Sequence, residues 1–163
     1  MAALLAADIA DRMKANVCGV VGYIADDAKN TRQAVAPNCL TTDTPSYDMT
    51  TAFSVLSSAP PNAAKDCGVK GAGCTAQQMA AYDLAKWSQT LYYGLPNGIG
   101  YVHYDSGATG AGGAVDVWVT WLDPAALSDG IYQDIDNKNT KNCPPGFQSV
   151  TPQPRCMYFR VGL

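Results

Sequence analysis

The chain opens with MAALLAADIADRMKAN, residues 1–16, and the predicted fold is organised around this segment. Apolar side chains recur every three or four residues at Ala2, Leu5, Ile9 and Met13, a spacing that places them on one face of a helix. Leu4 falls on the opposite side. We therefore predict an amphipathic helix over residues 2–16 that packs its apolar stripe on the protein and carries an apolar residue on its back.

Charged residues along this segment are spaced to pair with one another. Asp8 precedes Arg12 by four residues, and Asp11 precedes Lys14 by three. Pairs of this kind stabilise a helix by about 0.2–0.5 kcal/mol each when the acid lies N-terminal to the base. We expect both pairs to form on the helix surface.

Composition restricts the function. The 163 residues carry a net charge of −3, and the pI is near 4.8, so we expect no nucleic-acid partner. All the acidic residues are aspartates, and His103 is the single histidine. Few general acid–base pairs can be built from this set. We therefore expect no enzymatic activity, no cofactor and no metal.

Six cysteines occur without a C-x-x-C pair, so neither a zinc ribbon nor a thioredoxin-type motif is favoured. An even number among Gly-, Pro- and Thr-rich segments indicates three disulfides formed in an oxidising compartment. Fifteen connectivities are possible, and loop closure favours sequential pairing. The pairs that this predicts are Cys18–Cys39, Cys67–Cys74 and Cys143–Cys156.

Export is implied by these disulfides, although residues 1–163 contain no signal peptide and no apolar run long enough to span a membrane. The first helix also begins without an N-capping residue before it. We therefore expect that an export signal and the upstream part of this helix preceded residue 1 in a longer protein.

The rest of the chain predicts an α+β fold in a single domain, 1–163. Residues 17–74 are an irregular Cys-rich region, in which Val20–Ile24 is a short strand or a continuation of the helix. A second helix covers 75–94, because Thr75 and Gln78 form a capping box before a new apolar stripe. That stripe consists of Ala80, Leu84, Trp87, Leu91 and Leu95.

A β-sheet region follows over residues 99–163. The predicted strands are Ile99–Asp105, Ala114–Leu122 and Arg155–Leu163, all rich in β-branched and aromatic residues. Alternation in the middle strand makes one face more apolar than the other. This pattern predicts an antiparallel sheet covered by helices on one side.

Several motifs invite chemical readings that the spacing does not support. Gly107–Gly113 lacks the lysine and the following helix of a phosphate-binding loop. His103, Asp105 and Ser106 have the residue types of a hydrolytic triad, but they lie too close in one strand to face each other. Asp134 and Asp136 offer calcium-like oxygen ligands without the rest of an EF-hand, so a solvated acidic loop is favoured.

Trp118 stands apart, because it lies on the polar face of its strand. Trp87 and Trp121 fit the core stripes, whereas Trp118 can make an exposed contact, either with another subunit or with a glycan. A subunit contact is favoured.

Two segments resemble PilV-type minor pilins, the type IV pilus modification proteins of Gram-negative bacteria. The first is LAADIADRMKAN, residues 5–16, which resembles the helix that follows the membrane part of these proteins. The second is AAYDLAKWSQTLYYGLPNGIGYV, residues 80–102, which resembles their D-L-x-x-W helix, Leu-Pro-x-Gly turn and strand. The leader and the apolar membrane helix of the family are not in residues 1–163.

The resemblance implies a type IV pilin-like fold, in which the α1 helix packs on an antiparallel sheet and a disulfide closes the region near the C-terminus. Cys143–Cys156 is the natural candidate for that disulfide. It also implies a non-enzymatic role in the tip priming complex that initiates pilus assembly and supports twitching motility and adhesion. The partners implied are other minor pilins, the major pilin and a tip adhesin.

On this reading, the full-length protein is anchored in the inner membrane facing the periplasm before assembly and later lies at the pilus tip. The isolated domain is expected to be monomeric or weakly associated. The residues expected at subunit interfaces are Leu4, Ala7, Asp11, Lys14 and Trp118. Alternatives are a minor pseudopilin of a type II secretion system and, in another class, a secreted adhesion or glycan-binding module.

Overall fold

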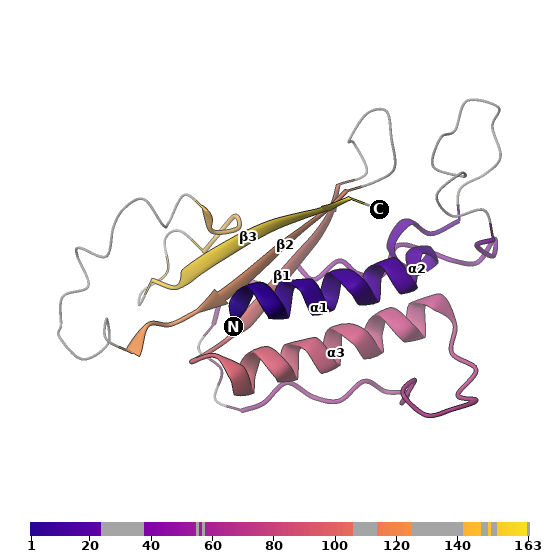
Figure 1. Ribbon diagram of the computed structural model, residues 1–163, viewed down its shortest axis with the longest axis horizontal. Coiled ribbons are helices and arrows are strands. Elements are labelled where there is room, and N and C mark those ends of the chain that lie inside the picture. The colour runs from indigo at the N-terminus through magenta and orange to yellow at the C-terminus, as the bar shows by residue number, and fades with distance from the viewer. Residues whose placement is uncertain are drawn as a thin grey trace.

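The computed structural model describes residues 1–23, 38–54, 56, 58–105, 114–124, 142–147, 150 and 153–162. Its helices lie in one layer and its strands in another (Figure 1). The fold is α+β, as the sequence predicts. The elements are α1 (Ala2–Ala15), α2 (Val17–Val21), α3 (Ala76–Gly94), β1 (Ile99–Asp105), β2 (Ala114–Trp121) and β3 (Arg155–Gly162).

The three strands form one antiparallel sheet in the order β1-β2-β3. Helices α1 and α3 run antiparallel to each other across one face of this sheet (Figure 1). Helix α1 packs on β2 and β3, whereas α3 packs on β1. No helix in the described part of the chain is long and apolar enough to span a membrane.

The apolar stripe of α1 is buried as predicted. Ala2, Leu5, Ile9 and Met13 all lie in the main core between the helices and the sheet. The Asp8–Arg12 ion pair is also present, with a distance of 3.1 Å. The predicted Asp11–Lys14 pair is wrong: both side chains are exposed, and they form no salt bridge.

Helix α2 departs from the prediction of an irregular region from residue 17. The chain breaks at Asn16, whose backbone leaves the helical range, and then resumes as one short helix over Val17–Val21. Of the two readings of Val20–Ile24, the helical continuation is right for residues 20 and 21. Gly22 ends α2 at φ +69, where a Cβ would come within 2.6 Å of the Pro45 side chain.

Helix α3 begins with the predicted capping box. The Thr75 hydroxyl accepts from the Gln78 N–H, and the Gln78 side chain accepts from the Thr75 N–H. Ala80, Trp87 and Leu91 of its stripe are buried, and Leu84 and Leu95 are partly buried. The inner face of β2 is buried at Val115, Val117 and Val119, while Trp121 is partly buried.

The other face of the sheet is not simply open, as the prediction of a sheet covered on one side implied. Phe53 and Phe147 pack with Tyr101 in a second apolar cluster at the β1 start of that face. The Cys143–Cys156 disulfide belongs to the same cluster. The segment around residue 147 therefore covers one end of the outer face.

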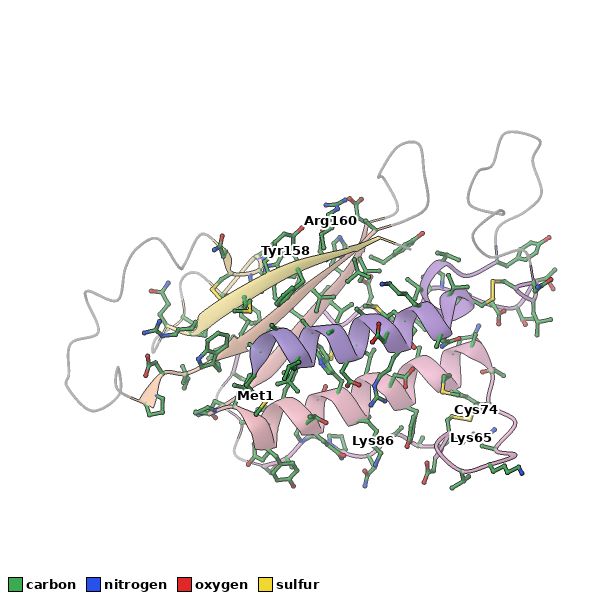
Figure 2. All side chains as sticks on the ribbon, in the orientation of Figure 1. Met1, Lys65, Cys74, Lys86, Tyr158 and Arg160 are labelled. Atoms are coloured by element: carbon green, nitrogen blue, oxygen red, sulfur yellow. A yellow bond between two sulfur atoms is a disulfide. The ribbon has the colours of Figure 1, made fainter. Side chains whose placement is uncertain are left out.

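Sequential pairing of the cysteines is confirmed. The three disulfides are Cys18–Cys39, Cys67–Cys74 and Cys143–Cys156. The first ties α2 to the segment after residue 37. The second closes the turn that leads into α3, close to Lys65 (Figure 2). Each therefore constrains a part of the chain that has little regular structure of its own.

Candidate interaction surface

Four of the residues predicted at subunit interfaces share the exposed back of α1. Leu4, Ala7, Asp11 and Lys14 are all exposed, and Leu4 is 72% accessible. They come together because residues three and four apart lie on the same side of a helix. We call these four residues the α1 back surface. Leu4 is the one large apolar side chain of this surface, beside a small alanine and two opposite charges.

Trp118, the fifth predicted interface residue, lies in a different part of the molecule. It stands on the outer face of the sheet, whereas α1 covers the inner face. Its ring packs against Tyr101 and Tyr158, with ring centroids 5.3 and 5.0 Å apart. The structure therefore does not bring Trp118 together with the α1 back surface.

A polar network fixes the rotation of α1 and so determines which face points outward. Asp83 of α3 is buried, with 5% of its surface exposed. Arg12 Nη1 donates to Asp83 Oδ1 at 3.2 Å, and the Tyr47 hydroxyl donates to Asp83 Oδ2 at 2.5 Å. Asn16 Nδ2 donates to the Ala76 carbonyl at 2.8 Å and to the Tyr47 hydroxyl at 3.3 Å. Three segments far apart in sequence are thereby joined.

Sequence reasoning did not identify this network. The one local signal is Asp83, a charged residue three positions after Ala80 and four before Trp87, and hence on the buried stripe of α3. Such a residue requires partners, because a buried charge is costly unless it is hydrogen-bonded. Nothing local in the sequence indicates that those partners are Arg12 and Tyr47.

The network also changes the protonation of its members. Burial raises the pKa of Tyr47 well above its usual value, and the hydrogen bond to Asp83 raises it further. Burial lowers the pKa of Arg12, but the hydrogen bonds and charges of Asp8 and Asp83 outweigh this effect and raise it overall. Arg12 therefore stays charged and Tyr47 stays neutral under ordinary conditions.

Tyr47 should make the protein sensitive to alkali. Above pH 10, the ordinary pKa of tyrosine, the unfolded chain releases the Tyr47 proton while the folded protein keeps it. The folded state then binds more protons, so the Tyr47 contribution to stability is complete below pH 10 and declines as the pH rises above it. We expect Tyr47→Phe to cost about 1 kcal/mol at pH 7 and progressively less above pH 10. Urea unfolding of both proteins across this range measures the difference, and a constant difference would contradict the prediction.

The chemical motifs of the sequence find little support among the described residues. His103 is exposed, and its Nδ1 lies 3.4 Å from Asp48 Oδ1. Asp105 pairs instead with Arg160, at 2.8 Å. Ser106, Gly107–Gly113, Asp134 and Asp136 lie outside the described residues. The triad, phosphate and calcium hypotheses that involve them stay predictions.

One group of residues has the composition of a metal site. The Sγ atoms of Cys18 and Cys39 lie close to an Asp43 carboxylate oxygen. The two sulfurs are joined in a disulfide and are therefore not available as thiolate ligands. Asp43 instead accepts from the Leu40 N–H at 2.7 Å and helps to shape the turn before it.

No protein-family model, no curated protein and no solved structure matches this chain. The α1 back surface, held outward by the Asp83 network, and residues 5–16 and 80–102 are therefore the features that bear on function.

Proposed function

We propose that this chain is a minor pilin of a type IV pilus, of the PilV type, with a type IV pilin-like fold. Its role is structural. It joins the tip priming complex that initiates pilus assembly, and so supports twitching motility and adhesion. In this role the chain catalyses no reaction, and it acts through the surface that binds neighbouring subunits.

The observation that carries the proposal is the two-sided character of α1. One side packs Leu5, Ile9 and Met13 into the core, and the other exposes Leu4 on the α1 back surface. A helix that only covers a sheet would gain solubility from a polar residue at position 4. The Asp83 network holds α1 in the rotation that keeps Leu4 outward, and the resemblance of residues 5–16 to minor pilins is to the same helix.

The partners that we propose for the α1 back surface are other minor pilins and the major pilin, with a tip adhesin carried by the same complex. Before assembly the protein is anchored in the inner membrane and faces the periplasm. After assembly it lies at the pilus tip on the cell surface.

Complementation of a deletion strain tests the proposal. Deleting the gene should strongly reduce surface pili and twitching, and the unaltered gene should restore both. Leu4→Lys should fail to restore them, because it places a charge in the subunit contact. The matched control is Tyr93→Lys on α3, where the tyrosine is 76% exposed and so resembles Leu4 in accessibility. Both variants should unfold within about 0.5 kcal/mol of the unaltered protein.

The outcomes separate the candidates for an assembly role. Normal piliation and twitching in the deletion strain would overturn the minor pilin proposal. Loss of protein secretion with pili intact would instead select the pseudopilin of a type II secretion system. Equal failure of Leu4→Lys and Tyr93→Lys would remove the α1 back surface as the specific contact.

One observation favours a candidate function of another class, a glycan-binding module. Tyr158 is 42% exposed, and its ring adjoins Trp118 on the outer face of the sheet. Asp116 accepts a hydrogen bond from the Tyr158 hydroxyl at 2.7 Å, so polar groups border the rings. Sugars bind where an apolar ring face lies beside such groups. A glycan array probed with the purified chain, and with Trp118→Ala as control, would detect this activity, and an array without signal would remove it.

A further inference from the structure

In the part of the chain that the structure describes, strand β3 is an edge strand of the sheet. Within the described residues its backbone pairs only with β2, through eight consecutive residue pairs from Arg155 to Gly162. The opposite edge, at β1, is occupied: Met49 exchanges two backbone hydrogen bonds with Val102, and the Asp48 carboxylate accepts from the Tyr104 N–H. Among the described residues, the β1 edge therefore has backbone hydrogen-bond partners, whereas the outer edge of β3 has none.

The Met49–Val102 bridge shows which β3 backbone groups point outward. In an antiparallel sheet, the N–H and C=O of one residue point to the same side, and successive residues alternate. Val102 points away from β2 because it bonds to Met49. Its partner Val117 must then point toward β3, and Phe159, the partner of Val117, toward β2. The residues that point outward are therefore Cys156, Tyr158, Arg160 and Gly162.

This edge lacks the features that normally prevent strands from pairing. Natural edges carry lysine, proline or a bulge. Strand β3 has no lysine or proline, and its register with β2 runs without a bulge. Its two arginines are both held in ion pairs: Arg155 with Asp123 at 2.7 Å, and Arg160 with Asp105 of β1 and Asp116 of β2 at 2.8 and 3.4 Å.

Side chains on both faces of β3 are left uncovered beside this edge. On the outer face, Tyr158 and Arg160 project from the strand (Figure 2). On the helix side, Met157 is 38% exposed and Phe159 is partly buried. A further strand would cover apolar surface on both faces as well as bond to the backbone.

We propose that β3 pairs antiparallel with β3 of a second copy of this chain, about a two-fold axis at Phe159. In this register Tyr158 lies opposite the partner's Arg160, and Cys156 opposite the partner's Gly162. All eight outward N–H and C=O groups of each edge then find partners on the other copy. Phe159 meets its own copy on the helix side, beside Met157. The edge is thus complementary to itself.

The two neighbouring registers that keep the outward groups paired are less favourable than the Phe159 register. An axis at Arg160 would place the two arginines directly opposite each other, a pairing that destabilises a sheet. An axis at Tyr158 would place Gly162 opposite the partner's Pro154, which has no N–H to donate. The Phe159 register avoids both and places an arginine beside a tyrosine ring, an attractive contact.

The helix layer leaves room for this arrangement. Helix α1 packs on both β2 and β3, so its axis lies about one strand spacing, roughly 4.8 Å, from the seam. Two such helices would lie about 10 Å apart, a normal packing distance. Arg12 marks the side of α1 that faces α3, and rotation by about 100° per residue places Ala3 and Ala10 on the other flank. Leu4 and Asp11 of the α1 back surface lie about 80–120° away from this flank. The contact through Leu4 therefore stays available, and this inference does not depend on the proposed function.

Sedimentation of the purified chain tests the proposal. We expect a reversible dimer with a Kd of about 10–100 µM, because a single strand pair gives modest affinity. Arg160→Pro removes one outward N–H and no bond to β2, while the matched control Arg160→Ala loses the same side chain but keeps the N–H. Two hydrogen bonds per dimer then separate the variants, so proline should weaken association about 30-fold more than alanine. A chain that stays monomeric at about 500 µM, or proline and alanine variants that associate equally, would overturn the proposal.

A cross-linking experiment tests the register with the native disulfides intact. Phe159→Cys places two cysteines directly opposite each other, with Cα atoms about 4.5 Å apart, within disulfide range. Met157→Cys is the control, because its two copies would be about 14 Å apart. Mild oxidation should give a covalent dimer of Phe159→Cys and leave Met157→Cys monomeric. Cross-linking of Met157→Cys to the same extent would overturn this register.

Discussion

Replacing Trp87 by alanine is expected to lower the free energy of unfolding by about 3–5 kcal/mol, the usual cost of deleting a buried aromatic side chain. Trp87 is fully buried, and its indole N–H donates to the Leu5 carbonyl at 2.7 Å. Its ring lies against Gly100 so closely that a Cβ there would come within 2.0 Å of it. One side chain thus joins α1, α3 and β1.

The measurement is urea unfolding followed by circular dichroism. Trp118→Ala is the matched control, since it deletes the same side chain from a partly exposed site on the outer face. It should cost clearly less than Trp87→Ala. Because a domain of this kind is stable by about 5–15 kcal/mol, Trp87→Ala should also lower the thermal midpoint by many degrees. Equal losses of unfolding free energy for Trp87→Ala and Trp118→Ala would contradict the prediction that Trp87 holds α1, α3 and β1 together.

Replacing Asp83 by alanine is expected to cost about 3 kcal/mol or more, because it leaves two partners without their acceptor. Tyr47 is 1% exposed, so its hydroxyl cannot reach water in compensation. Arg12 would keep its ion pair with Asp8 but lose its link to α3. We therefore expect a less stable protein whose α1 is less firmly held.

Asp8→Ala is the control for this prediction. It removes the other carboxylate that binds Arg12, but Asp8 is 40% exposed, and a pair at the surface contributes at most about 1 kcal/mol. The two variants should therefore differ by about 2 kcal/mol in urea unfolding. Similar costs would show that burial of the Asp83 partners does not matter. Asp83→Ala should also reduce piliation in the complementation assay if the rotation of α1 positions its back surface.

Local patterns in the sequence were sufficient for most of the secondary structure. The i, i+3, i+4 spacing of α1 and the capping box at Thr75 both act within one or two helical turns. The alternation in β2 acts through the two-residue period of a strand. The cysteine pairing follows from loop closure, which depends on separation along the chain. All of these are short-range properties.

The features that the sequence did not reveal depend on residues far apart in the chain. Asp83 signals a buried charge, but only the packing of α1 on α3 brings Arg12 to it. Phe147 reaches the outer face because its segment is tied to β3 through Cys143. At the break after α1, the Asn16 side chain likewise donates to the Ala76 carbonyl, sixty residues away.

The first helix illustrates the division. The sequence by itself determined that α1 has an apolar stripe with Leu4 opposite to it, because helical periodicity is a local property of the backbone. Only the tertiary structure decided that the stripe meets β2 and β3, and that the Arg12 flank meets α3. The position of β3 at the edge of the described sheet was decided in the same way, because strand order depends on which segments pair in space. Periodicity specifies which face of an element is buried, and packing specifies what it is buried against.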